Sequence, residues 1–133
     1  MEKLIEQLQK LNLPKNSFAI FGSGPMAVWG LKVAGDLDLL VKKEVWDRLA
    51  AEYGIENEEK GQIVVGDIDI FWNWQPWLDN EDELIATAEM IDGWPYVRLE
   101  HVLEWKKKYG REKDLKDVEL IEEYLLDKDN RTS

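Results

Sequence analysis

Four aspartates occur as two alternating pairs, and each pair lies in a stretch that is otherwise apolar. Asp36 and Asp38 begin one apolar run, and Asp67 and Asp69 interrupt a longer one. Side chains alternate between the two faces of a strand, so both members of a pair leave the same face, about 6–7 Å apart at the backbone. Unpaired buried carboxylates are costly, and Mg²⁺, which takes oxygen ligands, would offset that cost. The alternative is that this face of each strand lies in water.

If the two stretches pair as neighbouring strands, three or four carboxylates converge. Two divalent cations about 3.5–4 Å apart would then orient an in-line displacement at phosphorus. One cation would bind a triphosphate, and the other would lower the pKa of an attacking hydroxyl, whose proton a carboxylate takes. We expect Asp36, Asp38 and a later aspartate to be both metal ligands and catalytic residues. Asp69 is preferred to Asp67 because it lies deeper in its apolar run, although the sequence leaves that choice open.

A glycine–serine pair, Gly22 and Ser23, separates the apolar run 17–21 from a helix that is expected to begin at Pro25. Such a corner presents backbone N–H groups and a hydroxyl to an anion, and glycine lets a phosphate approach the backbone closely. We expect this corner to hold phosphate groups. The alternative is an ordinary helix start, because serine is a preferred N-cap residue.

The elements that must position these residues alternate along the chain. Apolar residues at helical spacing predict helices, and short apolar runs predict strands. Helices are expected over 2–11, 25–31, 43–53, 81–87, 99–109 and 113–126, the last with Leu115, Val118, Ile121 and Leu125 on one face; strands are expected over 17–21, 36–41, 62–72 and on both sides of Asp92–Gly93. This order predicts a single α/β (α+β) domain over 1–126, with a mixed twisted sheet flanked by helices, followed by a polar tail, 127–133.

Composition narrows the class of protein. The 133 residues are 44% hydrophobic and 34% charged, which is typical of one soluble globular domain. No apolar run approaches the roughly 18 residues of a membrane span. The absence of cysteine excludes a disulfide scaffold and a cysteine-based zinc site, and it favours the cytoplasm. A net charge of −11 repels nucleic-acid backbones, so nonspecific DNA or RNA binding is not expected.

Gly22–Ser23, a twelve-residue spacer (24–35) and Asp36-Leu37-Asp38 together resemble the signature of the DNA polymerase beta-like nucleotidyltransferase superfamily, in particular its small prokaryotic, minimal members. A third carboxylate on a later strand belongs to the same pattern. Residues 109–117 resemble the helix-turn-helix that closes many such domains. The likeness spans about residues 17–126 and implies a nucleotidyltransferase fold. It also implies Mg²⁺-dependent transfer of a nucleoside monophosphate from a nucleoside triphosphate (NTP), such as ATP, to a hydroxyl of a protein, an RNA or a small molecule.

The resemblance assigns roles to particular residues. Asp36, Asp38 and Asp69 would hold a two-ion Mg²⁺ site, and Gly22 and Ser23 would hold the triphosphate. Lys113 and Arg111 would reach phosphates, or else would only begin a helix.

The chain leaves little room for a separate acceptor domain, so a homodimer or a helical protein partner is a candidate to complete the site. The alternative to an enzyme is a non-catalytic nucleotide-binding or regulatory module, such as one half of a toxin–antitoxin pair.

Two further groups of residues have more than one interpretation. Trp72, Trp74 and Trp77 form a walled site for a base or an aromatic acceptor, or they fill the core. We favour core filling, with Trp77 the nearest of the three to a ligand. Lys106 and its charged neighbours at 104, 107 and 108 are expected to form a solvated helix face.

Overall fold

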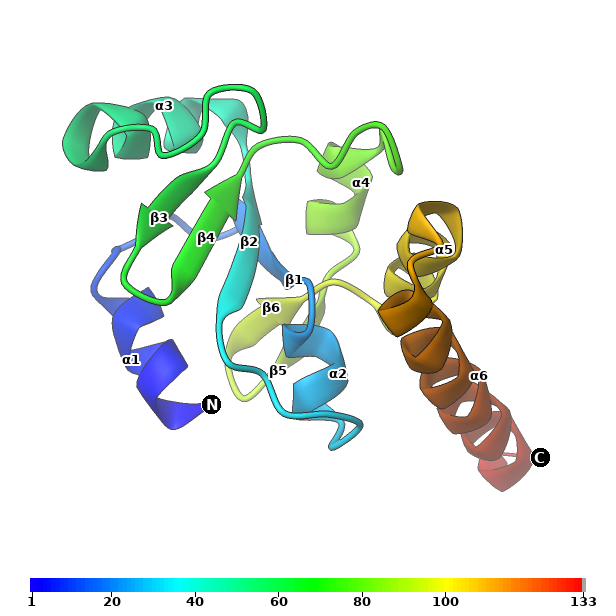
Figure 1. Cartoon of the computed structure of the whole chain (residues 1–133). Helices are drawn as coiled ribbons and strands as arrows, with labels where there is room; N and C mark the ends of the chain where they lie inside the picture. Colours follow the sequence, from blue (N-terminus) through cyan, green and yellow to red (C-terminus); the bar gives the residue numbers. More distant parts are fainter. Residues whose placement is uncertain (133) are drawn as a thin grey trace.

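A computed structural model describes the chain from Met1 to Thr132, with side chains as far as Lys128. The described residues form a six-stranded mixed sheet with helices on both faces (Figure 1). In chain order the elements are α1 (Glu2–Gln9), β1 (Phe18–Phe21), α2 (Gly24–Val28), β2 (Leu37–Val41), α3 (Lys43–Tyr53), β3 (Ile63–Val65), β4 (Ile68–Phe71), α4 (Glu81–Ala86), β5 (Glu89–Ile91), β6 (Trp94–Tyr96), α5 (Leu99–Tyr109) and α6 (Glu112–Thr132). The structure thus confirms the expected mixture of helices and a mixed sheet.

The strand order is β3-β4-β2-β1-β6-β5. Strand β2 pairs with β4 in parallel and with β1 in antiparallel orientation, and β1 pairs with β6 in parallel. Two antiparallel hairpins, β3–β4 and β5–β6, form the edges of the sheet. The two strands that carry aspartates, β2 and β4, are therefore neighbours near the middle of the sheet.

Alternation along the strands divides the apolar residues between two cores. Leu37, Leu39 and Val41 of β2 belong to the core covered by α1 and α3, whereas Leu40 belongs to the core covered by α2, α4, α5 and α6 (Figure 1). Asp38 lies two residues before Leu40 and so leaves the sheet on the second face. The helices of that face consequently enclose the aspartates.

Some predicted boundaries are wrong, and each error has a local cause. The stretch 62–72 is a hairpin and not one strand, because the backbone turns at Gly66, which has φ +60°. The helix expected to end at residue 126 continues to Thr132, since residues 127–132 contain neither glycine nor proline to stop it. Residue 133 of the predicted tail lies outside the described residues. Helix α5 and the turn at Asp92–Gly93 are found where the sequence predicts them.

None of the helices in the described part of the chain combines the length and the apolar character that crossing a membrane requires.

Candidate functional site

Three aspartates meet on the face of the sheet that α5 and α6 cover. Asp38 of β2 lies directly opposite Asp69 of β4 in the parallel ladder, so both side chains leave the same face. Asp36 lies two residues before Asp38 and lines the same cleft. The structure thus brings together Asp36, Asp38 and Asp69, as the sequence predicts for neighbouring strands.

Asp67 lies apart from this group. It occupies the turn between β3 and β4, where its backbone N–H donates to Gln7 Oε1 at 2.9 Å and its carboxylate accepts a hydrogen bond from Gln7 Nε2 at 3.0 Å. Gln7 belongs to α1, on the opposite side of the sheet. The interpretation that Asp67 and Asp69 share one strand face is therefore wrong, and of these two residues only Asp69 joins the acidic group.

The acidic group carries more negative charge than its surroundings neutralise. Burial raises the pKa of Asp38 to about 7, and the nearby charges of Asp36 and Asp69 and a hydrogen bond to Asp69 add to the rise. Burial also raises the pKa of Asp69, although Gln62 Nε2, which donates to its Oδ1 at 3.1 Å, acts in the opposite direction. Bringing a cation to these carboxylates would relieve both the desolvation and the repulsion.

A Mg²⁺ ion fits this arrangement in one particular way. Within the described residues, no three His, Cys, Asp or Glu side chains form a group that holds a metal by itself. Mg²⁺ usually keeps several waters and binds to one or two carboxylates together with phosphates of a substrate. Asp36, Asp38 and Asp69 offer oxygen donors suited to that mode of binding, in which the substrate completes the shell.

The Gly22–Ser23 corner packs directly against this acidic group. Phe21, the last residue of β1, pairs with Asp38 across the antiparallel ladder, and Gly22 follows it with φ +65°. A Cβ at position 22 would overlap the carboxylate of Asp38, so only glycine fits here. Ser23 occupies the N-cap position of α2, but its side chain forms no capping hydrogen bond in the described structure. It lines the cleft instead.

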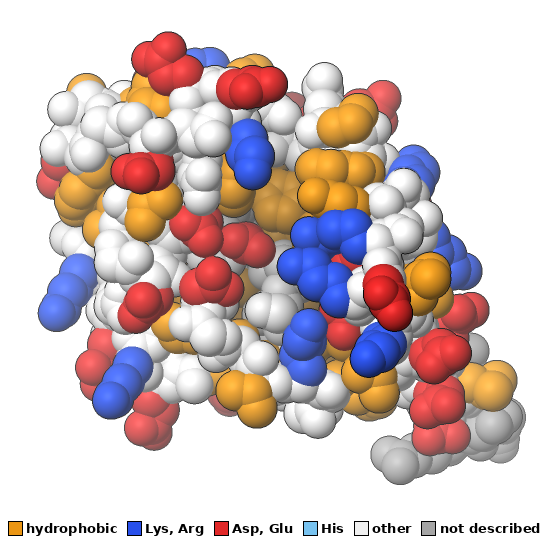
Figure 2. Space-filling model, viewed as in Figure 1, with side chains coloured by type: hydrophobic (Ala, Val, Ile, Leu, Met, Phe, Trp, Pro, Cys, Tyr) orange, Lys and Arg blue, Asp and Glu red, His pale blue; other side chains and the backbone are white. Residues whose placement is uncertain are grey.

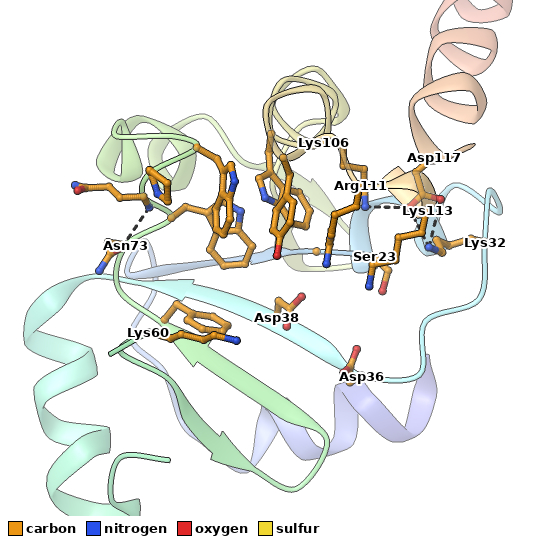
Figure 3. A pocket seen from close by; sticks show the side chains of 18 of the residues that line it. Ser23, Lys32, Asp36, Asp38, Lys60, Asn73, Lys106, Arg111, Lys113 and Asp117 are labelled. Carbon is orange, nitrogen blue, oxygen red and sulfur yellow. Dashed lines mark hydrogen bonds and ion pairs between the residues drawn. The ribbon is translucent and has the colours of Figure 1, made fainter. Parts of the chain in front are cut away.

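A basic wall faces the aspartates across the cleft. It consists of Lys106 on α5, Arg111 in the turn between α5 and α6, Lys113 on α6, and Lys32 in the loop before β2 (Figure 3). Figure 2 shows these cations gathered beside the acidic side chains. In a chain of net charge −11, such a concentration of positive charge suits the recognition of an anion.

Two buried carboxylates hold this wall in place. Asp114 is 0% exposed and Asp117 is 5% exposed. Asp114 receives hydrogen bonds from Arg111 Nε at 2.6 Å and Arg111 Nη2 at 3.0 Å. Asp117 receives Lys106 Nζ at 2.9 Å and Lys32 Nζ at 3.1 Å. Charge-assisted pairs of this kind fix the direction of the cationic side chains.

The structure corrects the expectation that Lys106 lies on a solvated helix face. Its side chain is buried, with 4% exposure for the residue, because α6 packs on α5 and supplies Asp114 and Asp117 as partners. Sequence reasoning missed this group, although a signal was present. Asp114 and Asp117 share the helical stripe of Val118 and Ile121, which is the buried stripe of α6.

The acidic floor and the basic wall enclose a cleft with a volume of about 640 Å³. Its lining continues from the charged residues to an aromatic end, where Phe71, Asn73, Trp74, Gln75, Pro76, Trp77, Trp105 and Tyr109 line it. A cleft of this volume is within the usual range for small-molecule and cofactor sites. Lys113, predicted to reach phosphates, lines the same cleft.

The three clustered tryptophans have separate locations. Trp74 is buried and stacks on Phe21, with ring centroids 4.3 Å apart, so it fills the core as we favoured. Trp72 packs against the core on the other face of the sheet. Trp77 is only partly buried and lines the cleft.

Comparison of the chain with models of known families, with curated proteins and with solved structures finds no match. We therefore argue the function from the geometry of the site.

Proposed function

We propose that this protein has the nucleotidyltransferase fold and is a Mg²⁺-dependent enzyme that transfers a nucleoside monophosphate from an NTP to a hydroxyl acceptor. The observation that carries the proposal is the position of Asp38. It lies opposite Asp69, packs on the glycine of the Gly22–Ser23 corner, and faces a basic wall. A cation site, a phosphate corner and a set of cations thus share one cleft.

The charged residues divide the work of binding. Asp36, Asp38 and Asp69 would hold Mg²⁺, which when bound polarises the reacting phosphate and acidifies the attacking hydroxyl. The backbone and hydroxyl of Gly22–Ser23 would bind phosphate oxygens, and Lys113 and Arg111 would orient the outer phosphates. Most of the catalysis would then come from positioning and from neutralising charge.

The transfer itself is a displacement at the α-phosphorus. The acceptor oxygen forms a bond to that phosphorus while the bond to the bridging oxygen of the β-phosphate breaks, and pyrophosphate leaves. Asp69 is partly exposed beside the aspartates of β2, so it is placed to accept the proton of the acceptor hydroxyl. Lys113 and Arg111 stabilise the charge that develops on pyrophosphate.

Calorimetry with MgATP tests the proposal. The wild-type protein should bind MgATP, and Asp36→Ala and Asp38→Ala should abolish the heat of binding. Asp67→Ala is the matched control, because Asp67 contacts Gln7 on the opposite side of the sheet and should leave the affinity unchanged. Equal affinities in the wild type and in the variants at positions 36 and 38 would refute the proposal.

Pyrophosphate release separates an enzyme from a binding module. With MgNTP and a panel of hydroxyl acceptors, the wild type should release pyrophosphate and Asp69→Asn should not. Nucleotide binding without release for any acceptor would instead support the non-catalytic alternative.

A further inference from the structure

At the aromatic end of the cleft, three planar groups are stacked into a column. The indole of Trp77 lies on the ring of Tyr109, with centroids 4.3 Å apart and planes 11° from parallel. The guanidinium carbon of Arg111 lies 3.7 Å from the centroid of the same ring. Because the indole already covers one face of Tyr109, the guanidinium must cover the other.

The column is anchored at its base. Arg111 is fixed by two hydrogen bonds to the fully buried Asp114, and Tyr109 also meets Trp105 edge-on, with ring centroids 6.5 Å apart. Trp77 therefore rests on a fixed support, and little side-chain freedom remains to be lost when a ligand binds to it.

The outer face of Trp77 differs from the faces of the other tryptophans in the cleft. Trp74 and Trp105 are each 6% exposed and pack against Phe21 and against each other. Trp77 lines the cleft, is only partly buried, and has no second aromatic ring stacked on it among the described side chains. It thus presents a planar surface to the cleft.

We propose that the nucleobase of the NTP stacks on the outer face of Trp77, and that purine nucleotides are preferred for this reason. The inference rests on the proposed function and names the substrate class of that site. Indole–base stacking depends on the area of overlap, and the two fused rings of a purine cover more of the indole than a single pyrimidine ring.

The layout of the cleft supports this direction for the nucleotide. Ser23 and Lys113, which would bind the outer phosphates, lie together at one end, and Asn73 lies at the other end (Figure 3). Asp38 lies between the two ends, where the α-phosphate would meet the cation. A nucleotide bound in this order places its base next to the loop that carries Asn73 and Trp77. The amides of Asn73 and Gln75 line this end and are available to the edge of the base.

The test compares ligands with and without a base. Calorimetry would measure the dissociation constants of MgATP, MgUTP and Mg-tripolyphosphate for the wild type, Trp77→Ala and Trp77→Phe. Trp94→Ala is the matched control, because Trp94 is a partly buried tryptophan that packs against the core on the other face of the sheet. Tripolyphosphate reports the phosphate and cation site alone.

We expect Trp77→Ala to weaken MgATP binding by roughly ten- to a hundredfold and to leave Mg-tripolyphosphate binding within about twofold of wild type. The preference for MgATP over MgUTP should shrink in the same variant. Trp77→Phe should lie between wild type and Trp77→Ala, and Trp94→Ala should bind all three ligands as the wild type does.

Several results would overturn the inference. Unchanged MgATP affinity in Trp77→Ala would show that the base lies elsewhere, including the case in which only transfer to the acceptor falls. Equal losses for MgATP and Mg-tripolyphosphate in both Trp77 variants would show that Trp77 supports the basic wall and not the base. If the wild type binds neither ligand, the proposed function fails, and the inference fails with it.

Discussion

Replacing Asp38 by asparagine should stabilise the protein in the absence of divalent cations. Burial and the neighbouring carboxylates raise the pKa of Asp38 from 3.8 to about 7, so the folded protein binds this proton more tightly than the unfolded chain does. Stability from this group is complete below pH 3.8 and is lost as the pH rises through 7. Asparagine has the same shape and carries no charge, and its amide can donate to Asp69.

The magnitude follows from the pKa of Asp38. The interval from 3.8 to about 7, at roughly 1.4 kcal/mol per pKa unit, corresponds to about 4 kcal/mol at pH 8. The carboxylate keeps some contact with solvent, so we expect about half of this, or about 2 kcal/mol, to be measured. For a domain of this size, the gain in Tm is about 6–10 °C.

Urea denaturation with a chelator at pH 8 and at pH 4 would measure the effect. The free energy of unfolding of Asp38→Asn should exceed that of wild type at pH 8, and the difference should nearly vanish at pH 4. Asp67→Asn is the control, since Asp67 lies in the β3–β4 turn and is hydrogen-bonded to Gln7. A variant that is no more stable than wild type at pH 8, or whose gain is the same at both pH values, would refute the reasoning.

Two other substitutions probe the supports of the site. Gly22→Ala should lower the free energy of unfolding by about 3 kcal/mol and abolish MgATP binding, because a Cβ there overlaps Asp38 and adds to the strain of a positive φ; Gly30→Ala, where φ is also positive but the surrounding space is open, should cost only about 1 kcal/mol and retain binding. Asp114→Asn should lower the free energy of unfolding by about 3 kcal/mol, because it leaves buried cationic partners uncompensated, and it should weaken MgATP binding through the loosened Arg111; chemical denaturation and calorimetry would check both, and unchanged values would contradict the anchoring role.

The acidic side of the site could be predicted from local sequence pattern. Alternation of Asp36 and Asp38 with apolar residues is enough to put both on one face, and the order of elements makes a neighbouring strand with Asp69 a reasonable expectation. Choosing Asp69 over Asp67 needed the hairpin, which depends on one residue, Gly66. A single glycine in a long apolar run is a weak signal, since a strand can also tolerate it.

The basic wall was harder to predict because buried ion pairs resemble surface charges in a sequence. Helix α6 was expected to bury Leu115 with the other apolar residues of its stripe, yet Leu115 is 55% exposed. Asp114 and Asp117 occupy the inward positions instead and pair with Lys106 from the preceding helix. Only the packing of α5 against α6 decides which charges are removed from water, and that packing depends on residues far from the motif.

The most direct test of the central claim is a crystal structure of the protein with Mn²⁺ and a non-hydrolysable NTP analogue, using the anomalous signal of manganese to locate the ion. We expect manganese between the carboxylates of Asp36, Asp38 and Asp69, in contact with phosphate oxygens held at Gly22–Ser23. Manganese bound at other acidic residues, or a triphosphate bound away from the Gly22–Ser23 corner with these three aspartates in contact only with water, would contradict the claim.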